Sequence, residues 1–205
     1  MAKAKIKYTK NELKKQRETL KRLVRYLPTL ELKKTQLLQE IARIQSEIDT
    51  LQREISTTEQ AVMKWVSLFA EDVDIFSLIE VKDINTSHDN IAGVDIPVFE
   101  DIDVQENEYD FITTPLWVDQ GVAVAKEQMI RKAKIMIAEE QQRVLHEEFR
   151  KIVQRINLFE KVKIPEAKEN IRVIQIYIGD QMTAGVVTGK IAKSKMDNKK
   201  RLANV

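Results

Sequence analysis

Apolar residues recur every seven positions from Ile6 to Phe69. Nine of the ten positions in this row are apolar, and a second row, three residues further on, is apolar at six of eight. Two rows in this relation form the a/d seam of a coiled coil, so the pattern predicts one long helix that packs against another. The first row is Ile6, Leu13, Leu20, Leu27, Lys34, Ile41, Ile48, Ile55, Val62 and Phe69. The second row is Gln16, Leu23, Leu30, Leu37, Ile44, Leu51, Thr58 and Trp65.

A second apolar stripe of helical period begins after Pro115 and Gly121. Its steps average about 3.7 residues, against about 3.5 in the first stripe, which predicts weaker left-handed supercoiling. Pro28 and Pro165 each lie inside a predicted helix, where proline favours a kink or local opening, near 26–30 in the first helix. The second stripe is Ile130, Ala133, Ile137, Leu145, Phe149, Ile152, Ile156, Phe159, Ala167, Ile171, Ile174, Ile178 and Met182, with Gln141 and Lys163 in its gaps.

The segment between the two stripes alternates apolar and polar residues in the manner of short strands. Residues 78–84 and 94–104 predict a β-hairpin, with Pro97 on an edge strand. Because an isolated hairpin is not stable in water, its apolar residues should pack on the helices or on a partner protein. These residues include Ile96, Phe99 and Phe111, and the predicted turn residues are Asn85, Thr86, Ser87, Asp89, Asn90 and Gly93.

Together these elements predict a mainly α fold, a long antiparallel two-helix coiled coil with a small β-hairpin insert between the helices. The tail loses the apolar period and gains Gly and Lys, so we expect it to fray or to order only against a partner. The expected segments are an N-terminal coiled-coil helix at 1–75, a hairpin or irregular acidic insert at 76–117, a C-terminal coiled-coil helix at 118–182 and a basic tail at 183–205.

Composition narrows the function classes. Only 5 Gly and 4 Pro among 205 residues disfavour turn-rich β folds, and the absence of Cys excludes disulfides and thiolate zinc sites. No apolar run approaches the roughly 20 residues of a membrane-spanning helix, so we expect a soluble chain. The net charge of +2 conceals +8 in residues 1–25, +5 in 190–205 and −12 in 71–110. An antiparallel pairing of helices would bring the two basic ends together.

Candidate ligand sites have the wrong spacing. Between Gly185 and Gly189 lie three residues, and Ile191 follows Lys190, whereas a phosphate-binding loop needs four residues and then Ser or Thr. The two histidines, His88 and His146, have no second ligand at metal spacing, and the acidic cluster lacks the central glycine of a calcium loop. That cluster is Glu100, Asp101, Asp103, Glu106 and Glu108. We predict no catalytic residue, no cofactor, no metal site and no small-molecule substrate.

Three stretches of the chain occur in a specific order and spacing. In that order they resemble the D subunit of the rotary V-type and archaeal A-type ATPases, in a bacterial version. The chain departs from the family pattern at three places. Tyr8 replaces the usual proline, Asn157-Leu-Phe159 replaces the commoner Asn-Ala-Leu, and Gly179 interrupts a stretch that is often helical in family members. The stretches are Tyr8-Thr-Lys-Asn-Glu-Leu13 with Leu32-Lys-Lys34; Asn90-Ile-Ala-Gly-Val94 with Pro97, Tyr109 and Thr114-Pro-Leu-Trp-Val-Asp119; and Arg155-Ile-Asn157 through Glu160, Ile164-Pro165 and Ile171.

The resemblance implies a non-catalytic central rotor shaft that transmits torque. Its paired termini would insert into a hexamer of catalytic and nucleotide-binding subunits. Its other end would couple, through a small rotor stalk subunit and an adaptor subunit, to a membrane ring that carries protons or sodium ions. Such a protein is peripheral, at the cytoplasmic face of the membrane.

A free-standing coiled-coil scaffold or a nucleic-acid-associated protein is the alternative interpretation. The basic termini could neutralise phosphates, but they lack interleaved aromatic residues and a known nucleic-acid-reading motif. We therefore expect no direct contact with nucleic acid.

Overall fold

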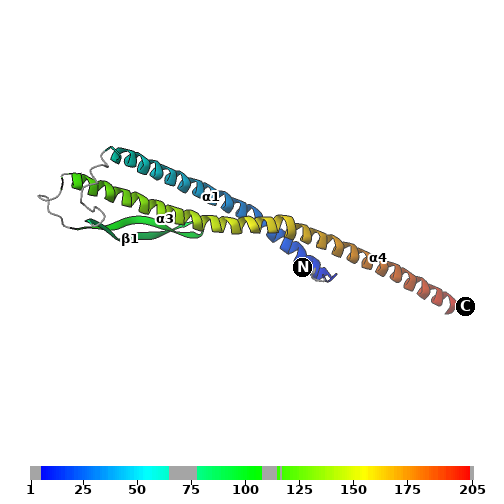
Figure 1. Ribbon diagram of the computed structural model, residues 1–205. Helices are drawn as coiled ribbons and strands as arrows, with labels where there is room; N and C mark the ends of the chain where they lie inside the picture. Colours follow the sequence, from blue (N-terminus) through cyan, green and yellow to red (C-terminus); the bar gives the residue numbers. More distant parts are fainter. Residues whose placement is uncertain (1–5, 65–77, 108–114, 116, 204–205) are drawn as a thin grey trace. The chain divides into compact units, whose positions relative to one another are not determined.

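The computed structural model of the protein describes residues 6–64, 78–107, 115 and 117–203 (Figure 1). The chain falls into two compact units, which we call unit 1 (Met1–Glu31 and Gln154–Val205) and unit 2 (Leu32–Val153). The predicted fold class, two long helices with a hairpin between them, is confirmed. The elements are α1 (Lys10–Val62), β1 (Ile79–Ile91), β2 (Val94–Glu106), α3 (Trp117–Leu158), the π-helical turn η2 (Phe159–Lys163) and α4 (Ile164–Ala203).

The first helix begins at a capped turn and continues through its proline. The Glu12 N–H donates to Thr9 Oγ1 at 3.2 Å, which satisfies one of the free N–H groups at the start of α1. Pro28 lies inside α1, so the prediction of one helix rather than two is confirmed. Every apolar member of the two predicted rows from Leu13 to Val62 is buried or half-buried, and Trp65 and Phe69 lie outside the described residues.

In unit 2 the facing parts of α1 and α3 run antiparallel. Three polar contacts between described residues show this. From one contact to the next, the residue number rises on α1 and falls on α3, which is the order that antiparallel helices give. The contacts are Lys33 Nζ to Glu148 Oε1 at 3.7 Å, Gln142 Nε2 to Gln45 Oε1 at 2.7 Å, and Arg131 Nε to Glu54 Oε2 at 3.3 Å.

In unit 1 the same order holds between α1 and α4. The centre of the Tyr8 ring, just before α1, lies 5.0 Å from the centre of the Tyr177 ring on α4. Leu23, further along α1, lines one groove together with Lys163, which directly precedes α4. We call the parts of unit 1 before residue 32 and after residue 153 its two arms, and these arms are therefore also antiparallel.

The second apolar stripe is confirmed from Ile130 to Ile178, where its apolar members are buried or half-buried. Met182 is an exception, because it is exposed, and Ala138 is buried although the stripe omitted it. The helix begins at Trp117, one residue before the predicted segment 118–182, and it contains Gly121, which precedes the apolar stripe. The fully buried side chains of the described helices are Leu37, Ile44, Val118, Leu145, Ile152 and Ile174.

The hairpin is longer than predicted, and its turn is tighter. β1 continues through residues 85–90, which the sequence assigned to the turn, and pairs antiparallel with β2 up to Ile91 opposite Val94. The turn is Ala92-Gly93, with φ of 53° and 76°. A two-residue turn with positive φ at both residues matches the right-handed twist of the paired strands. Asn90 Oδ1 stabilises this turn by accepting a hydrogen bond from the Gly93 N–H at 2.9 Å. The polar residues of 85–90 suit an edge strand whose side chains are mostly exposed.

The tail is helical, which contradicts the expectation of fraying. α4 extends to Ala203 and includes Gly179, Gly185 and Gly189. Each glycine costs about 1 kcal/mol in a helix interior, and Val186, Val187 and Thr188 favour helix only weakly, but the lysine, alanine and methionine residues from Lys190 to Ala203 favour it. Local propensity therefore outweighs the loss of the apolar period.

We predict that stability depends on the buried positions of the helix pair. Leu37→Ala removes a side chain with 0% exposure and should lower the free energy of unfolding by about 3 kcal/mol. Its neighbour Leu38 is 51% exposed, so Leu38→Ala should change that free energy by less than about 0.5 kcal/mol. Urea unfolding followed by circular dichroism measures both, and equal losses would contradict the assigned seam.

Candidate functional site

The hairpin is held along α3, and polar contacts mark its course (Figure 1). As the residue number on α3 rises, the number of its β2 partner falls, so β2 runs antiparallel to α3. The contacts are Lys126 Nζ to Glu106 Oε1 at 2.6 Å, Lys134 Nζ at 5.6 Å from the centre of the Phe99 ring, and Gln141 Nε2 to the Pro97 carbonyl at 2.5 Å.

Apolar packing holds the hairpin at its open end. Ile79 forms a buried cluster with Val118 and Val122 of α3, and Val104 packs against it. Ile96, near the turn, is 2% exposed and lines a groove with Ala138. The expectation that the insert packs on the helices is confirmed for Ile96, Phe99 is half-buried, and Phe111 lies outside the described residues.

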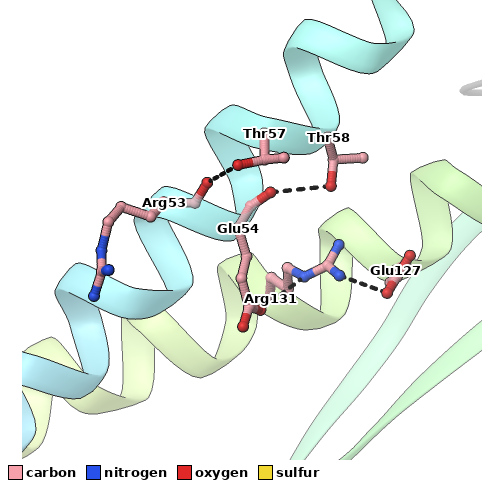
Figure 2. Close-up of polar contacts among 6 residues, drawn as sticks. All are labelled: Arg53, Glu54, Thr57, Thr58, Glu127 and Arg131. Carbon is pink, nitrogen blue, oxygen red and sulfur yellow. Dashed lines mark hydrogen bonds and ion pairs between the residues drawn. The ribbon is translucent and has the colours of Figure 1, made fainter.

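A polar layer interrupts the helix pair of unit 2 near the end of α1 (Figure 2). Its groove, of about 330 Å³, is lined by three threonines of α1 and by charged residues of both helices. Thr57 donates to the Arg53 carbonyl at 2.9 Å and Thr58 to the Glu54 carbonyl at 3.0 Å. Because these hydroxyl protons are committed to the backbone, the groove does not present them to a base. The lining residues are Thr50, Arg53, Glu54, Thr57, Thr58 and Arg131.

Arg131 is the centre of this polar layer. Its side chain is 18% exposed and forms ion pairs with Glu54 of α1 at 3.3 Å and with Glu127 of α3 at 2.5 Å (Figure 2). Its Nη1 atom is buried without a hydrogen-bond partner, and so are both amide atoms of Gln128. A buried unpaired polar atom costs free energy, so this layer contributes less to stability than the apolar seam.

Perturbed ionisation occurs on the surface of the helices. The hydrogen bond from Arg143 lowers the pKa of the Glu140 carboxyl below its ordinary value and raises the pKa of the Arg143 guanidinium. A hydrogen bond to Glu40 likewise raises the pKa of Arg43, and one to Glu169 raises that of Arg172. These are pairs three residues apart on one helix, the usual source of modest helix stabilisation.

The second half of α4 is exposed throughout the described residues, and just before it Gln181 and Met182 line a groove with Tyr8 and Lys10. The Tyr8–Tyr177 contact sets the start of α1 beside residue 177, and every described side chain from Gly179 to Lys199 is exposed. We call residues 179–199 the tail helix. It presents apolar side chains together with lysines: Met182, Val186, Val187, Ile191 and Met196 with Lys190, Lys193, Lys195 and Lys199.

The candidate ligand residues of the sequence are not brought together. Gly185, Gly189 and Lys190 lie on the continuous helix α4, so they form no loop around a phosphate. His88 lies on β1 opposite Pro97, and His146 is exposed on α3. Within the described ranges, no three His, Cys, Asp or Glu side chains converge as a metal site would require. The described acids of the cluster, Glu100, Asp101, Asp103 and Glu106, are exposed on β2.

No helix in the described part of the chain combines the length and the apolar character needed to cross a bilayer.

Three known proteins similar to this chain share one name. The family model described as the ATP synthase D subunit matches residues 12–194. The V-type ATP synthase D subunit of Borreliella burgdorferi is 46% identical over 198 residues, covering 97% of this chain and 98% of that protein. The proteins of the same name from Chlamydia felis and Chlamydia trachomatis serovar L2 are 33% and 34% identical, and each comparison covers 95% of this chain and at least 95% of the relative.

We predict that Gln128 is replaceable by an apolar side chain. Gln128→Met removes two buried atoms that lack partners and should raise the free energy of unfolding by about 1 kcal/mol. The matched control is Gln142→Met, which loses a 2.7 Å hydrogen bond to Gln45 and should not stabilise the protein. Thermal unfolding compares the two variants, and a lower melting temperature for Gln128→Met would show that this amide is satisfied in solution.

Proposed function

The chain belongs to the family of ATP synthase D subunits, and from that membership we propose that it is the central rotor shaft of a V-type ATP synthase. The shaft transmits torque between a hexamer that hydrolyses or synthesises nucleotide and a membrane ring that translocates ions. The chain itself carries out no catalysis. The observation that carries the proposal is the family match over nearly the whole chain, together with two antiparallel helices in each unit.

The helix pair suits a torque element. Two helices whose side chains interlock resist bending and sliding better than one, because a shift would expose the close-packed apolar residues of both. In unit 2 this packing includes Leu37, Ile44 and Leu145, all with 0% exposure. The ion pairs between the helices are partly exposed, so they contribute little to stiffness beyond fixing the register.

The tail helix suits insertion into the hexamer. Its side chains are exposed, so they are available to line a contact with catalytic and nucleotide-binding subunits. A rotating contact cannot rely on a few rigid pairs. Lysines held by diffuse attraction to surrounding acidic residues can change partners as the shaft turns.

The remaining partners follow from the same role. A small rotor stalk subunit and an adaptor subunit would link this chain to the membrane ring. We place the protein at the cytoplasmic face of the membrane, as a peripheral component of the complex. The proposed functional segments are 1–75, 76–117, 118–182 and 183–205, and the acidic hairpin, which packs on α3, belongs to the second of them.

We predict that linking the tail helix to the hexamer stops turnover. The chain has no Cys, so Val187→Cys offers a single attachment site for a maleimide-benzophenone probe. In the reconstituted complex, illumination should join the chain to a hexamer subunit and abolish most of the ATP hydrolysis.

The control carries the same probe at Ala42→Cys, a site of unit 2 that is exposed, where illumination should leave turnover largely unchanged. Full hydrolysis by the linked Val187→Cys complex would exclude rotation of this chain against the hexamer.

We predict that the tail lysines hold the hexamer electrostatically. Replacing Lys190, Lys193, Lys195 and Lys199 by Gln should weaken association about 10-fold at low salt, and the difference should shrink above about 0.5 M salt because exposed charges are screened. Replacing Lys82, Lys132, Lys161 and Lys168, which lie outside the tail, is the matched control. Sedimentation with the isolated hexamer measures both, and a loss that does not depend on salt would contradict diffuse attraction.

A further inference from the structure

The two arms of unit 1 both depart from regular α-helix at one level. In α1, Pro28 has no N–H for the Val24 carbonyl, so one backbone hydrogen bond is missing. In the other arm, the Ile164 N–H reaches back five residues to the Phe159 carbonyl, which defines the π-turn η2. Pro165 follows at once and has no N–H for the Lys161 carbonyl.

The antiparallel register places these two departures face to face. Leu23 and Lys163 line one groove, and the antiparallel register set by Tyr8 against Tyr177 places the last residue of η2 near residues 22–23 of α1. Four residues back along η2 is Phe159, and about four residues forward along α1 is Leu27, directly before Pro28. The π-turn therefore faces the turn of α1 whose hydrogen bond is missing.

The π-turn holds one residue more than the seam requires. Leu145 and Ile152 are seven residues apart and both are buried, as are Ala167 and Ile174. From Ile152 to Ala167, however, there are fifteen residues, one more than two heptads. A π-turn accommodates one inserted residue in an α-helix, so η2 absorbs the extra residue and returns the following helix to the seam.

Packing at this level is thin. No residue from 157 to 166 is buried, although Ile156 and Ala167 on either side are, and α1 has no buried residue from 10 to 36, a stretch that includes the facing residues 20–30. Several large apolar side chains remain between 44% and 58% exposed here, namely Val24, Tyr26, Leu158 and Val162. Few buried contacts and weakened backbone hydrogen bonds are the physical signs of a segment that opens locally at low free energy.

We propose that Pro28 and η2 form a two-sided flexing joint in the paired arms. One side has a missing backbone hydrogen bond, and the other has a spare residue that can be taken up or released. The joint lets the arms bend or twist at this level while the seams before and after it stay packed. It concerns the chain by itself and does not rest on the proposed function.

Hydrogen exchange of the full chain tests the joint. Amides of residues 22–30 and 157–165 should exchange at least about 10-fold faster than those of 14–20 and 168–174 in the same unit, and faster than those of 40–48 and 143–151 in unit 2. Because the two sides face each other, Pro28→Ala should also slow exchange in 157–163. Equal rates at the joint and on both flanks, or no effect of Pro28→Ala on the facing arm, would overturn the proposal.

A deletion tests the spare residue separately. Removing Lys161 together with Pro165→Ala should convert η2 to α-helix, restore the fourteen-residue spacing from Ile152 to Ala167, and keep the melting temperature within about 3 °C. Removing Glu147, an exposed residue between Leu145 and Ile152, is the matched control and should lower the melting temperature by more than about 10 °C, because the buried residues Ile152 and Ile156 rotate out of the seam. Similar losses for both deletions would show that η2 holds no spare residue.

Discussion

The structure depends on the close packing of small apolar rows between antiparallel helices. Leu37 and Ile44 on α1, and Leu145 and Ile152 on α3, have almost no exposed surface, although neither helix is strongly apolar overall. Because the rows are narrow, each helix has one permitted orientation about its axis. The hairpin then has a defined surface to cover, and its own buried residues Ile79 and Ile96 meet α3 rather than solvent.

The same narrowness makes the seam sensitive to chain length. One inserted residue would turn the rest of a regular helix by about 100° and bring its apolar row out of the interface. The second arm contains such a residue, and η2 confines the disturbance to one turn between Ile156 and Ala167. The π-turn fits the fifteen-residue spacing from Ile152 to Ala167, and Pro165 makes this turn a suitable place for it, since a regular helix there would lack a hydrogen bond.

The periodic elements could be predicted from sequence because their signal repeats many times. Both helices, the antiparallel pairing and the hairpin follow from the spacing of apolar residues. The hairpin turn could not be placed, because the residue types of Asn85–Asn90 are as common in turns as in an exposed edge strand, and only the paired strand decides between them. The helical tail was missed because its apolar period ends while its helix propensity continues. The gap at Thr58 marked the position of the polar layer, because Thr58 lines its groove. The average step of the second stripe is about 3.7 residues both before and after Ile156, so it gave no signal of η2.

Rigid and yielding parts of this chain therefore have separate physical origins. Where the heptad is complete, as from Leu37 to Ile48, burial holds the helices together. Where polar side chains enter the seam, as at Gln128 and Arg131, unpaired atoms reduce that gain, although ion pairs keep the register. Where the backbone itself is interrupted, at Pro28 and η2, neither burial nor regular hydrogen bonds resist deformation. The first and the last of these properties have different sources: complete heptads provide the packed stretches, and the two prolines together with one extra residue provide the proposed joint.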